Sequence, residues 1–597
     1  MSTRNFGAQL LTLRLVFENH FFNIPDYQRS YSWEEEQVND LIKDIEHLMS
    51  DGVYLRHYTG TLVLSQQKGR ELGTFDIVDG QQRLTTLVIF MKAISLYLDP
   101  CKKQDVEARY LWRGNIGSER YVLRLNTDTR MFHEKVVLGD ANTANNPPNL
   151  ESHERLLRAR SIIDKWLAEK MKNDSSSAAK VLESLETELG FLVYAPMEDA
   201  ETGIMFEVIN NRGKQLSELE KVKNYLIYCC VKLSANSLRE TINSDWSVVL
   251  KNLNDAKKTS TSDEGAFLRY CVAVYYKSNK SDSQYGYNEL KKALKIDSAM
   301  NDDNIKAMTI ESIRDFVEFL KTASLWYNRL YGRKHNGVSP KIIPILDQIR
   351  AQQQHASIMP LFLSLVIKSQ DMGDSLVHLL GLLEIVNFRV YMAANRTYRN
   401  DAGQGELYRY ASRFYHNELL GDFGCIPVKI GRTEITSEEK ALEYRLVEFT
   451  LNYATDERFE SSFSLEKDSP DDFYKWDGLR YFLMNYEAML QPNRTIYIDQ
   501  ILLSRQQVKS GDYLSVEHLW AQKNRIDEGE NNREIDKHEK KRLGNFVLLE
   551  LRSNIQGSHE GLEQKLPIYV GKSGSPEATN LAQVRKMEKD ADRKSVV

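Results

Sequence analysis

The chain is poor in cysteine, long apolar runs and net positive charge, and each shortage excludes a class of protein. Its five cysteines include no C-x-x-C pair and no regular spacing, which argues against a structural zinc site and a disulfide scaffold. No stretch of about 18 apolar residues occurs, and the N-terminus has no secretion signal, so we expect a soluble, cytoplasmic protein. The net charge of −5 gives no overall attraction to nucleic acid, so any contact with DNA must be local.

The length and periodicity of the chain predict several domains. A chain of 597 residues with 42% hydrophobic residues can bury more than one core. We expect a multidomain α+β protein with an α/β domain over 1–232, a helical connector over 233–450 and a third domain over 451–597. The helical block carries no residues at catalytic spacing, which is typical of a scaffold.

Local patterns within the first part predict particular elements. The runs at 57–65 and 74–80 are typical of strands, and the apolar spacing over 83–98 is helical. A strand, a tight glycine turn and a helix are therefore expected in succession. Further along, Ser217 and Glu220 stand three residues apart, which is the spacing of a capping box at the start of a helix.

The sequence DIVDGQQRLTTL places polar residues at this strand-to-helix turn. A helix start points free N–H groups and the positive end of the helix dipole at whatever lies above it, and this favours an anion. Gly80 allows close approach, Arg83 can grip a phosphate, and Gln81 and Gln82 offer neutral donors and acceptors. Asp79 could orient a sugar hydroxyl, bind Mg²⁺ or polarise water. Taken alone, an Asp-Gly turn that only caps a helix is equally compatible with these residues.

A second group of polar residues lies near the C-terminus. Phosphodiester hydrolysis needs a base, a cation and groups that align them. Glu517 and His518 are adjacent at the end of a strand-like run, and Asn545 and Asn554 follow downstream. Because neighbouring side chains on a strand point to opposite faces, Glu517 and His518 reach one site only if the strand ends or bends there.

Four segments of the first part occur in a specific order, namely IPDYQRSYSW, YTGTLVL, DIVDGQQRLTTL and INNRGKQLSELEKVKN. Together they resemble the N-terminal domain of the GmrSD-type restriction endonucleases, a modification-dependent, type IV family whose domain is similar to the ParB and sulfiredoxin fold. The resemblance implies that the domain binds and hydrolyses a nucleoside triphosphate. No Walker A motif is present, so the site is not a P-loop. The residues that the resemblance places at this site are Arg29, Asp79, Gly80, Gln81, Gln82, Arg83, Asn211 and Arg212.

The C-terminal segments S-V-E-H-L-x-x-Q, R-L-G-N-F-V-L-L and N-x4-H-x5-K resemble the HNH-type nuclease domain of the same family. That domain has a ββα-metal layout. The resemblance implies that Glu517 and Asn554 are metal ligands, that His518 is the general base and that Asn545 is an orienting catalytic residue. Oxygen ligands suit a hard cation, so Mg²⁺ or Mn²⁺ is expected.

The chain departs from the HNH pattern at two positions. Ala521 stands where the family usually has proline, and His559 stands at a family asparagine, so that His559 could replace or supplement the second metal ligand. Lys565 matches a family lysine that is expected to contact DNA phosphate. Lys541 and Arg542 belong to a basic run that is expected to do the same.

These features predict an anti-phage endonuclease that cuts foreign, modified double-stranded DNA by metal-dependent hydrolysis under the control of a nucleotide. Assembly into a homo-oligomer is compatible with this reading. Two alternatives stay open. One is a nucleotide- or DNA-sensing regulator with a degenerate HNH site. The other is an N-terminal nucleotide hydrolase or nuclease whose C-terminal domain only binds DNA.

Overall fold

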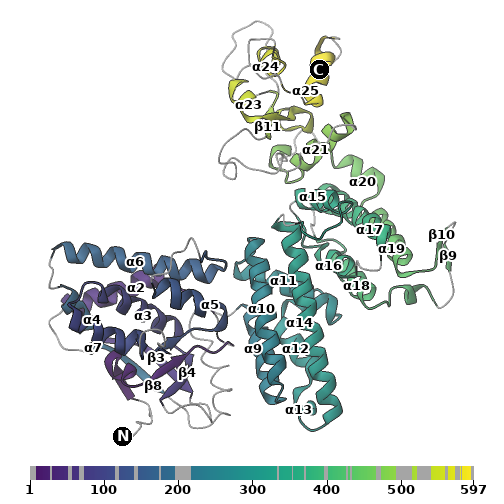
Figure 1. Cartoon of the computed structure of the whole chain (residues 1–597). Coiled ribbons are helices and arrows are strands. Elements are labelled where there is room, and N and C mark those ends of the chain that lie inside the picture. The colour runs from purple at the N-terminus through teal and green to yellow at the C-terminus, as the bar shows by residue number, and fades with distance from the viewer. Residues whose placement is uncertain are drawn as a thin grey trace. The chain divides into compact units, whose positions relative to one another are not determined.

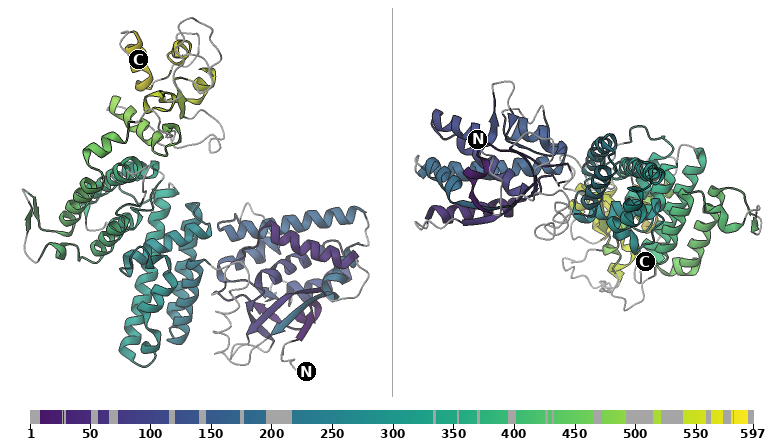
Figure 2. Two further views of the ribbon diagram at one scale, coloured as in Figure 1. Left: turned by 180° about the vertical axis from the view of Figure 1, so that it is seen from behind. Right: turned by 90° about the horizontal axis from the view of Figure 1, so that it is seen from below.

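The structure is a computed structural model of the chain, which divides into two compact units (Figures 1 and 2). Unit 1 comprises Met1–Leu268 and Tyr285–Leu325, and unit 2 comprises Arg269–Gln284 and Trp326–Val597. The structure describes residues 9–26, 28, 30–50, 57–65, 73–114, 120–139, 146–173, 177–194, 217–332, 335–352, 354–368, 372–394, 401–424, 428–430, 433–464, 472–491, 514–520, 539–557, 562–571, 579 and 581–592.

Unit 1 contains a mixed six-stranded sheet. Its strands, in spatial order, are β1 (Gln9–Thr12), β8 (Leu189–Tyr194), β3 (His57–Ser65), β4 (Thr74–Asp79), β2 (Phe21–Asn23) and β7 (Leu123–Arg124). Strand β3 is parallel to β8 and antiparallel to β4, whereas β2 is parallel to both of its neighbours. The two strands predicted at 57–65 and 74–80 are therefore confirmed, and they lie next to each other.

Helix α3 (Gln81–Ser95) follows β4 directly and occupies the core of unit 1. Every residue of α3 except Arg83 is buried, as expected for a helix that is covered on all sides. It packs against α6 (Glu151–Asn173), which in turn contacts α2 (Glu35–Ser50) (Figure 1). The predicted helix at 83–98 is confirmed, although it begins two residues earlier, directly after the glycine turn.

From residue 217 onward, unit 1 is built of helices in the part that the structure describes. Helix α9 (Glu218–Lys232) begins at the predicted capping box, where the Ser217 amide donates to Glu220 Oε2 at 2.8 Å and the Glu220 amide donates to Ser217 Oγ at 3.1 Å. Helix α10 (Asn236–Asp255) and α12 (Gly286–Leu294) both pack on α9. The long helix α14 (Asp303–Tyr331) and α11 (Thr261–Tyr275) contribute residues to both units.

Unit 2 is also mostly helical. Helices α16 (Met359–Ile367), α17 (Gly373–Val386), α18 (Gln404–Tyr415) and α19 (Glu438–Tyr453) pack against one another. Within the described residues, one helical stretch, Gly373–Ala394, is long and apolar enough to cross a membrane by length and composition, and 56% of its apolar window is buried. Because α17 contacts α16 and α19, we regard this stretch as a core helix of unit 2.

The C-terminal region of unit 2 contains a two-stranded antiparallel sheet followed by short helices. Strand β11 (Leu514–His518) pairs with β12 (Phe546–Glu550), so that Glu517 lies opposite Val547 and His518 opposite Phe546. Helices α23 (Leu551–Gly557), α24 (Leu562–Tyr569) and α25 (Ala582–Asp592) follow. The mixed α+β class with an N-terminal sheet is confirmed. The ParB-like and ββα-metal assignments and the domain boundaries stay predictions.

Candidate functional sites

The turn between β4 and α3 depends on a glycine. Gly80 has a φ of +91°, and a Cβ at this position would lie 3.0 Å from Leu62 Cδ1 and 3.1 Å from the Thr61 carbonyl oxygen. Only glycine adopts this conformation without strain in such a close space. The N-cap of α3 is Gly80 itself, which has no side chain that could accept from the first-turn amides. Anion binding at this helix start stays a prediction.

Gln82 attaches a neighbouring loop to this turn. Its Oε1 accepts from the Ser32 amide at 2.8 Å, and its Nε2 donates to the Ser30 carbonyl at 3.2 Å. Gln28 adds a further link, because its Nε2 donates to the Val78 carbonyl oxygen at 2.6 Å. The amide of Gln82 is thus used within the protein, and Ser30 and Ser32 are held beside the start of α3.

Gln81 and Arg83, the neighbours of Gln82, differ from it in burial and hydrogen bonding. Gln81 is only 6% exposed, yet its Oε1 has no hydrogen-bond partner within the described residues. A buried acceptor without a donor is costly, so it marks a position where a ligand N–H group would be stabilising. Arg83 is half-buried and is the sole residue of α3 that is not buried. Asp79, at the end of β4, is also half-buried.

Gly60 makes room for the Arg83 guanidinium. A Cβ on Gly60 would lie 2.4 Å from Arg83 Nη1, and the φ of Gly60 is +139°. This role of Gly60 was not among the predictions made from the sequence. The available signal was a glycine within the strand-like run YTGTLVL, which often marks a close approach by another group.

The remaining residues predicted for the nucleotide site, Arg29, Asn211 and Arg212, lie outside the described residues. The neighbours of Arg29 are described and are well anchored. Asn126, which is 1% exposed, donates from Nδ2 to the Gln28 carbonyl at 3.0 Å and to Ser30 Oγ at 3.2 Å. The chain on either side of Arg29 is therefore fixed to the same sheet edge as the glycine turn.

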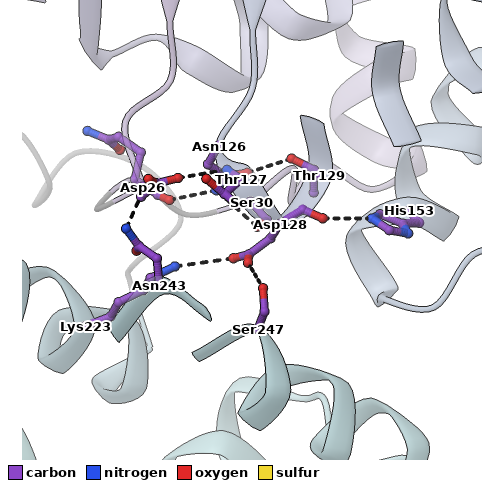
Figure 3. Close-up of polar contacts among 11 residues, drawn as sticks. Asp26, Ser30, Asn126, Thr127, Asp128, Thr129, His153, Lys223, Asn243 and Ser247 are labelled. Carbon is purple, nitrogen blue, oxygen red and sulfur yellow. Dashed lines mark hydrogen bonds and ion pairs between the residues drawn. The ribbon is translucent and has the colours of Figure 1, made fainter. Parts of the chain in front are cut away.

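A polar network that the sequence analysis missed connects this loop to the helices of unit 1 (Figure 3). Asp26 accepts from the Thr127 amide at 2.8 Å and from Asn243 Nδ2 at 3.1 Å. Asp128 accepts a hydrogen bond from the Ser247 hydroxyl and forms an ion pair with Lys223 at 3.3 Å.

The ion pair of this network is buried, because the side chains of Asp128 and Lys223 are only 3% and 9% exposed. The partners are far apart in sequence, since Asp26 and Asn243 are 217 positions apart, so no local pattern predicts their contact. The network joins the segment after β2 to α9 and α10 within unit 1.

Five of the six strands of the sheet, the glycine turn and the residues anchored beside it fall within one family match, whereas β1 begins three residues before it. Residues 12–227 match the GmrSD restriction endonuclease, N-terminal domain. The predicted resemblance to this N-terminal domain is thus confirmed for the matched residues. No curated protein matches the chain. The match ends at residue 227, so the C-terminal HNH domain stays a prediction.

Downstream of the GmrSD N-terminal domain, Glu517 is the most constrained of the predicted nuclease residues. Its Oε1 accepts from Lys565 Nζ at 2.6 Å and from the Tyr569 hydroxyl at 2.7 Å. Lys565 also donates to the His518 carbonyl oxygen at 2.9 Å. Burial and the neighbouring carboxylate raise the pKa of Tyr569 above its ordinary value, so its hydroxyl stays a donor. The Lys565 ammonium, which was expected to meet phosphate, is engaged inside the protein.

His518 lies on the opposite face of β11 from Glu517, as strand alternation requires. Its ring packs against Tyr474, with centroids 4.4 Å apart, and against Phe546, with centroids 5.0 Å apart. Burial lowers the pKa of His518 below its ordinary value, while Glu517 and Asp472 act in the opposite direction. The imidazole is therefore mostly neutral at pH 7 and able to accept a proton.

Asn545 holds together the two chain segments that flank the hairpin. Its Oδ1 accepts from the Trp520 amide at 2.8 Å, and its Nδ2 donates to the Lys540 carbonyl at 2.8 Å and the Trp520 carbonyl at 3.2 Å. The side chain is 1% exposed, so these bonds are costly to break. Asn545 thus fixes the chain directly after His518, which suits the orienting role predicted for it.

Glu517 and Asn554 are residue types that bind hard cations, but Glu517 Oε1 already accepts from Lys565 and Tyr569. Asn554 donates from Nδ2 to Ser515 Oγ at 2.8 Å, which leaves its amide oxygen as an available ligand type. Ser515 and Glu517 are two residues apart on β11 and therefore share a face, so the Asn554 amide and the Glu517 carboxylate belong to the same side of the hairpin. Within the described residues, no group of three or more His, Cys, Asp or Glu side chains could hold a metal ion.

The remaining predicted nuclease residues lie at or beyond the edge of the described hairpin. His559 and Ala521 are outside the described residues. Lys541 is half-buried and Arg542 is exposed, both in the segment that leads into β12. The catalytic, metal-binding and phosphate-binding roles of these residues stay predictions.

Proposed function

We propose that the chain is an anti-phage endonuclease that cleaves foreign, modified double-stranded DNA, and that a nucleoside triphosphate bound in the N-terminal domain controls the cleavage. The observation that carries this proposal is the match of residues 12–227 to a restriction endonuclease N-terminal domain. DNA cleavage also agrees with the absence of an overall positive charge, because an enzyme needs basic residues only along one groove.

The nucleotide site of this proposal is the start of α3. In this proposal the start of α3, which has Gly80 as its N-cap, supplies backbone N–H groups to a phosphate, and Arg83 adds a charged donor. The unpartnered Gln81 Oε1 would accept a hydrogen bond from the ligand. Gln82 contributes indirectly, because it bonds Ser30 and Ser32, which follow Arg29 in the sequence.

Cleavage in this proposal occurs at the β11–β12 hairpin. His518 takes a proton from the attacking water, and Asn545 keeps the chain after His518 in place. Glu517 and Asn554 would hold Mg²⁺ or Mn²⁺, which when bound supplies a positive charge that stabilises the leaving oxygen. His518 and Glu517 emerge from opposite faces of β11, so the scissile phosphate has to lie at the end of the strand, where both faces can be reached.

The Asp26 and Asp128 network is the proposed link between nucleotide binding and cleavage. A nucleotide that contacts Arg29 acts on the loop that begins at Asp26, and Asp26 is hydrogen-bonded to Asn243 on α10. Rearrangement of this loop would thus shift α10 within unit 1. An Arg83→Ala variant that cuts DNA with unchanged nucleotide dependence and unchanged substrate choice would refute this control.

The test is the cleavage of modified and unmodified phage DNA by the wild type and by His518→Ala, with Mg²⁺ or Mn²⁺ and each nucleoside triphosphate in turn. His378→Ala is the matched control, because His378 is an exposed histidine of unit 2 far along the chain from the hairpin. We expect His518→Ala to lose cleavage by at least about two orders of magnitude, as is typical for loss of a general base, and His378→Ala to keep it.

The other outcomes select between the alternatives. Cleavage that survives in His518→Ala would move catalysis to the N-terminal domain. A wild type that cuts none of these substrates but binds nucleotide would favour the regulator, and the pairing of Glu517 with Lys565 is the observation that keeps this candidate in view.

A further inference from the structure

Helix α24 places a positive charge on the carboxylate that is expected to bind metal. Lys565 Nζ lies 2.6 Å from Glu517 Oε1, with side chains that are 1% and 6% exposed, respectively. The Tyr569 hydroxyl, one turn further along α24, donates to the same oxygen at 2.7 Å. Two donors from one helix therefore occupy one carboxylate oxygen in a site that water barely reaches.

A divalent cation cannot simply be added to this arrangement. A buried carboxylate needs a compensating charge, and Lys565 already supplies it. A metal ion on the same carboxylate would meet the ammonium at short range, where the low polarity of the interior makes repulsion between like charges strong. A cation therefore competes with Lys565 for Glu517.

We propose that Lys565 holds the place of the divalent cation at Glu517, so that metal binds to the hairpin only by displacing the ammonium. This inference rests on the proposed function, in which Glu517 is a metal ligand. Two further features support displacement. Lys565 also bonds the His518 carbonyl, so its departure frees the backbone of the expected base at the same time. Helix α24 contains Pro567, which cannot donate a backbone hydrogen bond, so the helix is easier to displace than an unbroken one.

The first test measures binding of Mn²⁺ alone to the full chain by calorimetry, without DNA or nucleotide. Lys565→Gln keeps a hydrogen-bond donor but removes the competing charge, so we expect Mn²⁺ to bind at least about tenfold more tightly than to the wild type. Lys586→Gln, which changes an exposed lysine on α25, should leave the affinity unchanged. Glu517→Gln should abolish the gain when it is combined with Lys565→Gln.

The second test uses the unaltered sequence and so does not depend on the folding of a variant. Acetylation of lysines, read by mass spectrometry, should spare Lys565 in the metal-free chain and reach it when Mn²⁺ is added. Lys586 should react equally in both states, and Glu517→Gln should remove the effect of Mn²⁺ on Lys565.

Three results would overturn the inference: equal Mn²⁺ affinity in the wild type and Lys565→Gln, binding that does not depend on Glu517, or Lys565 labelling that is unchanged by bound Mn²⁺. The proposed nuclease activity is decided separately by His518→Ala, so its failure can be told apart from the failure of the lysine exchange.

Discussion

The glycine turn at Gly80 and the hairpin at Glu517 are both built on buried polar groups, but they are held in different ways. The turn is held by neutral groups, namely the amides of Gln28 and Gln82 and backbone atoms. The hairpin is held by a buried ion pair between Glu517 and Lys565. Gln28 and Gln82 fix the turn through neutral amides, without using a charge. A site held by an ion pair has to give up an internal partner before its charge can serve a ligand.

The largest effect should come from breaking the ion pair. Lys565→Met leaves a buried carboxylate without a counter-ion and should lower the free energy of unfolding of this region by about 3 to 5 kcal/mol. The double variant Glu517→Leu with Lys565→Met removes both charges and should stay within about 1 kcal/mol of the wild type. Urea denaturation followed by protease cleavage near the hairpin measures both. Equal losses of stability in the single and double variants would contradict a role for the ion pair in holding the hairpin.

A smaller loss is expected when the neutral hold is broken. Gln82→Leu leaves the Ser32 amide and the Ser30 carbonyl without their partner, which should cost about 2 kcal/mol. Gln37→Leu is the control, because Gln37 accepts its hydrogen bond from the Glu34 amide at the exposed surface. Chemical denaturation gives the two values. If both variants lose the same stability, the loop is not held by Gln82.

The stability of unit 1 should depend on pH through a buried histidine. His133 is fully buried in unit 1, and burial lowers its pKa to about 3. The unfolded chain therefore binds a proton near pH 6.5 that the folded chain rejects, so the contribution of His133 to stability is complete above pH 6.5 and is lost as the pH falls towards 3.

The size of this effect is about 1.4 kcal/mol for each pH unit below 6.5. His133→Phe should remove that part of the acid sensitivity. The comparison is made by chemical denaturation at pH 7.5 and 5.5, and a variant that loses as much stability as the wild type on acidification would show that other groups dominate.

The smallest effect concerns the network between the loop and α10. Asn243→Leu removes one hydrogen bond to Asp26 and should cost about 1 kcal/mol of stability. Nucleotide affinity should be unchanged. The stimulation of DNA cleavage by nucleotide should fall about fivefold, which is at the lower end of typical coupling between two sites. Asn254→Leu, which loses an exposed bond to the Asn149 carbonyl, is the control. Equal stimulation in both variants would remove Asn243 from the coupling.

The elements that the sequence predicts well are those with local signals. A pattern of about ten residues or fewer predicts each of the elements that the structure confirms, namely β3, β4, α3 and the capping box at Ser217. Strands β1, β2 and β7 are two to four residues long and are defined by distant partners, so no periodicity could reveal them.

The candidate sites follow the same rule. The residues of the glycine turn are adjacent in sequence, and their grouping was predictable. The partners of Glu517 were not, because Lys565 lies 48 residues away and the sequence gives it an equally plausible role on DNA phosphate. The close approach of Arg83 to Gly60 likewise joins helix α3 to strand β3, which only the fold brings together.

The place of β8 in the sheet has a consequence for how the protein is made. Residues 189–194 lie between β1 and β3, although both of those strands emerge from the ribosome long before. The sheet therefore stays open until residue 194 has been synthesised, which takes about 10 to 40 s at typical rates of translation. During that time β1 and one edge of β3 lack their partner strand. We therefore expect this domain to need protection from aggregation during its synthesis on the ribosome.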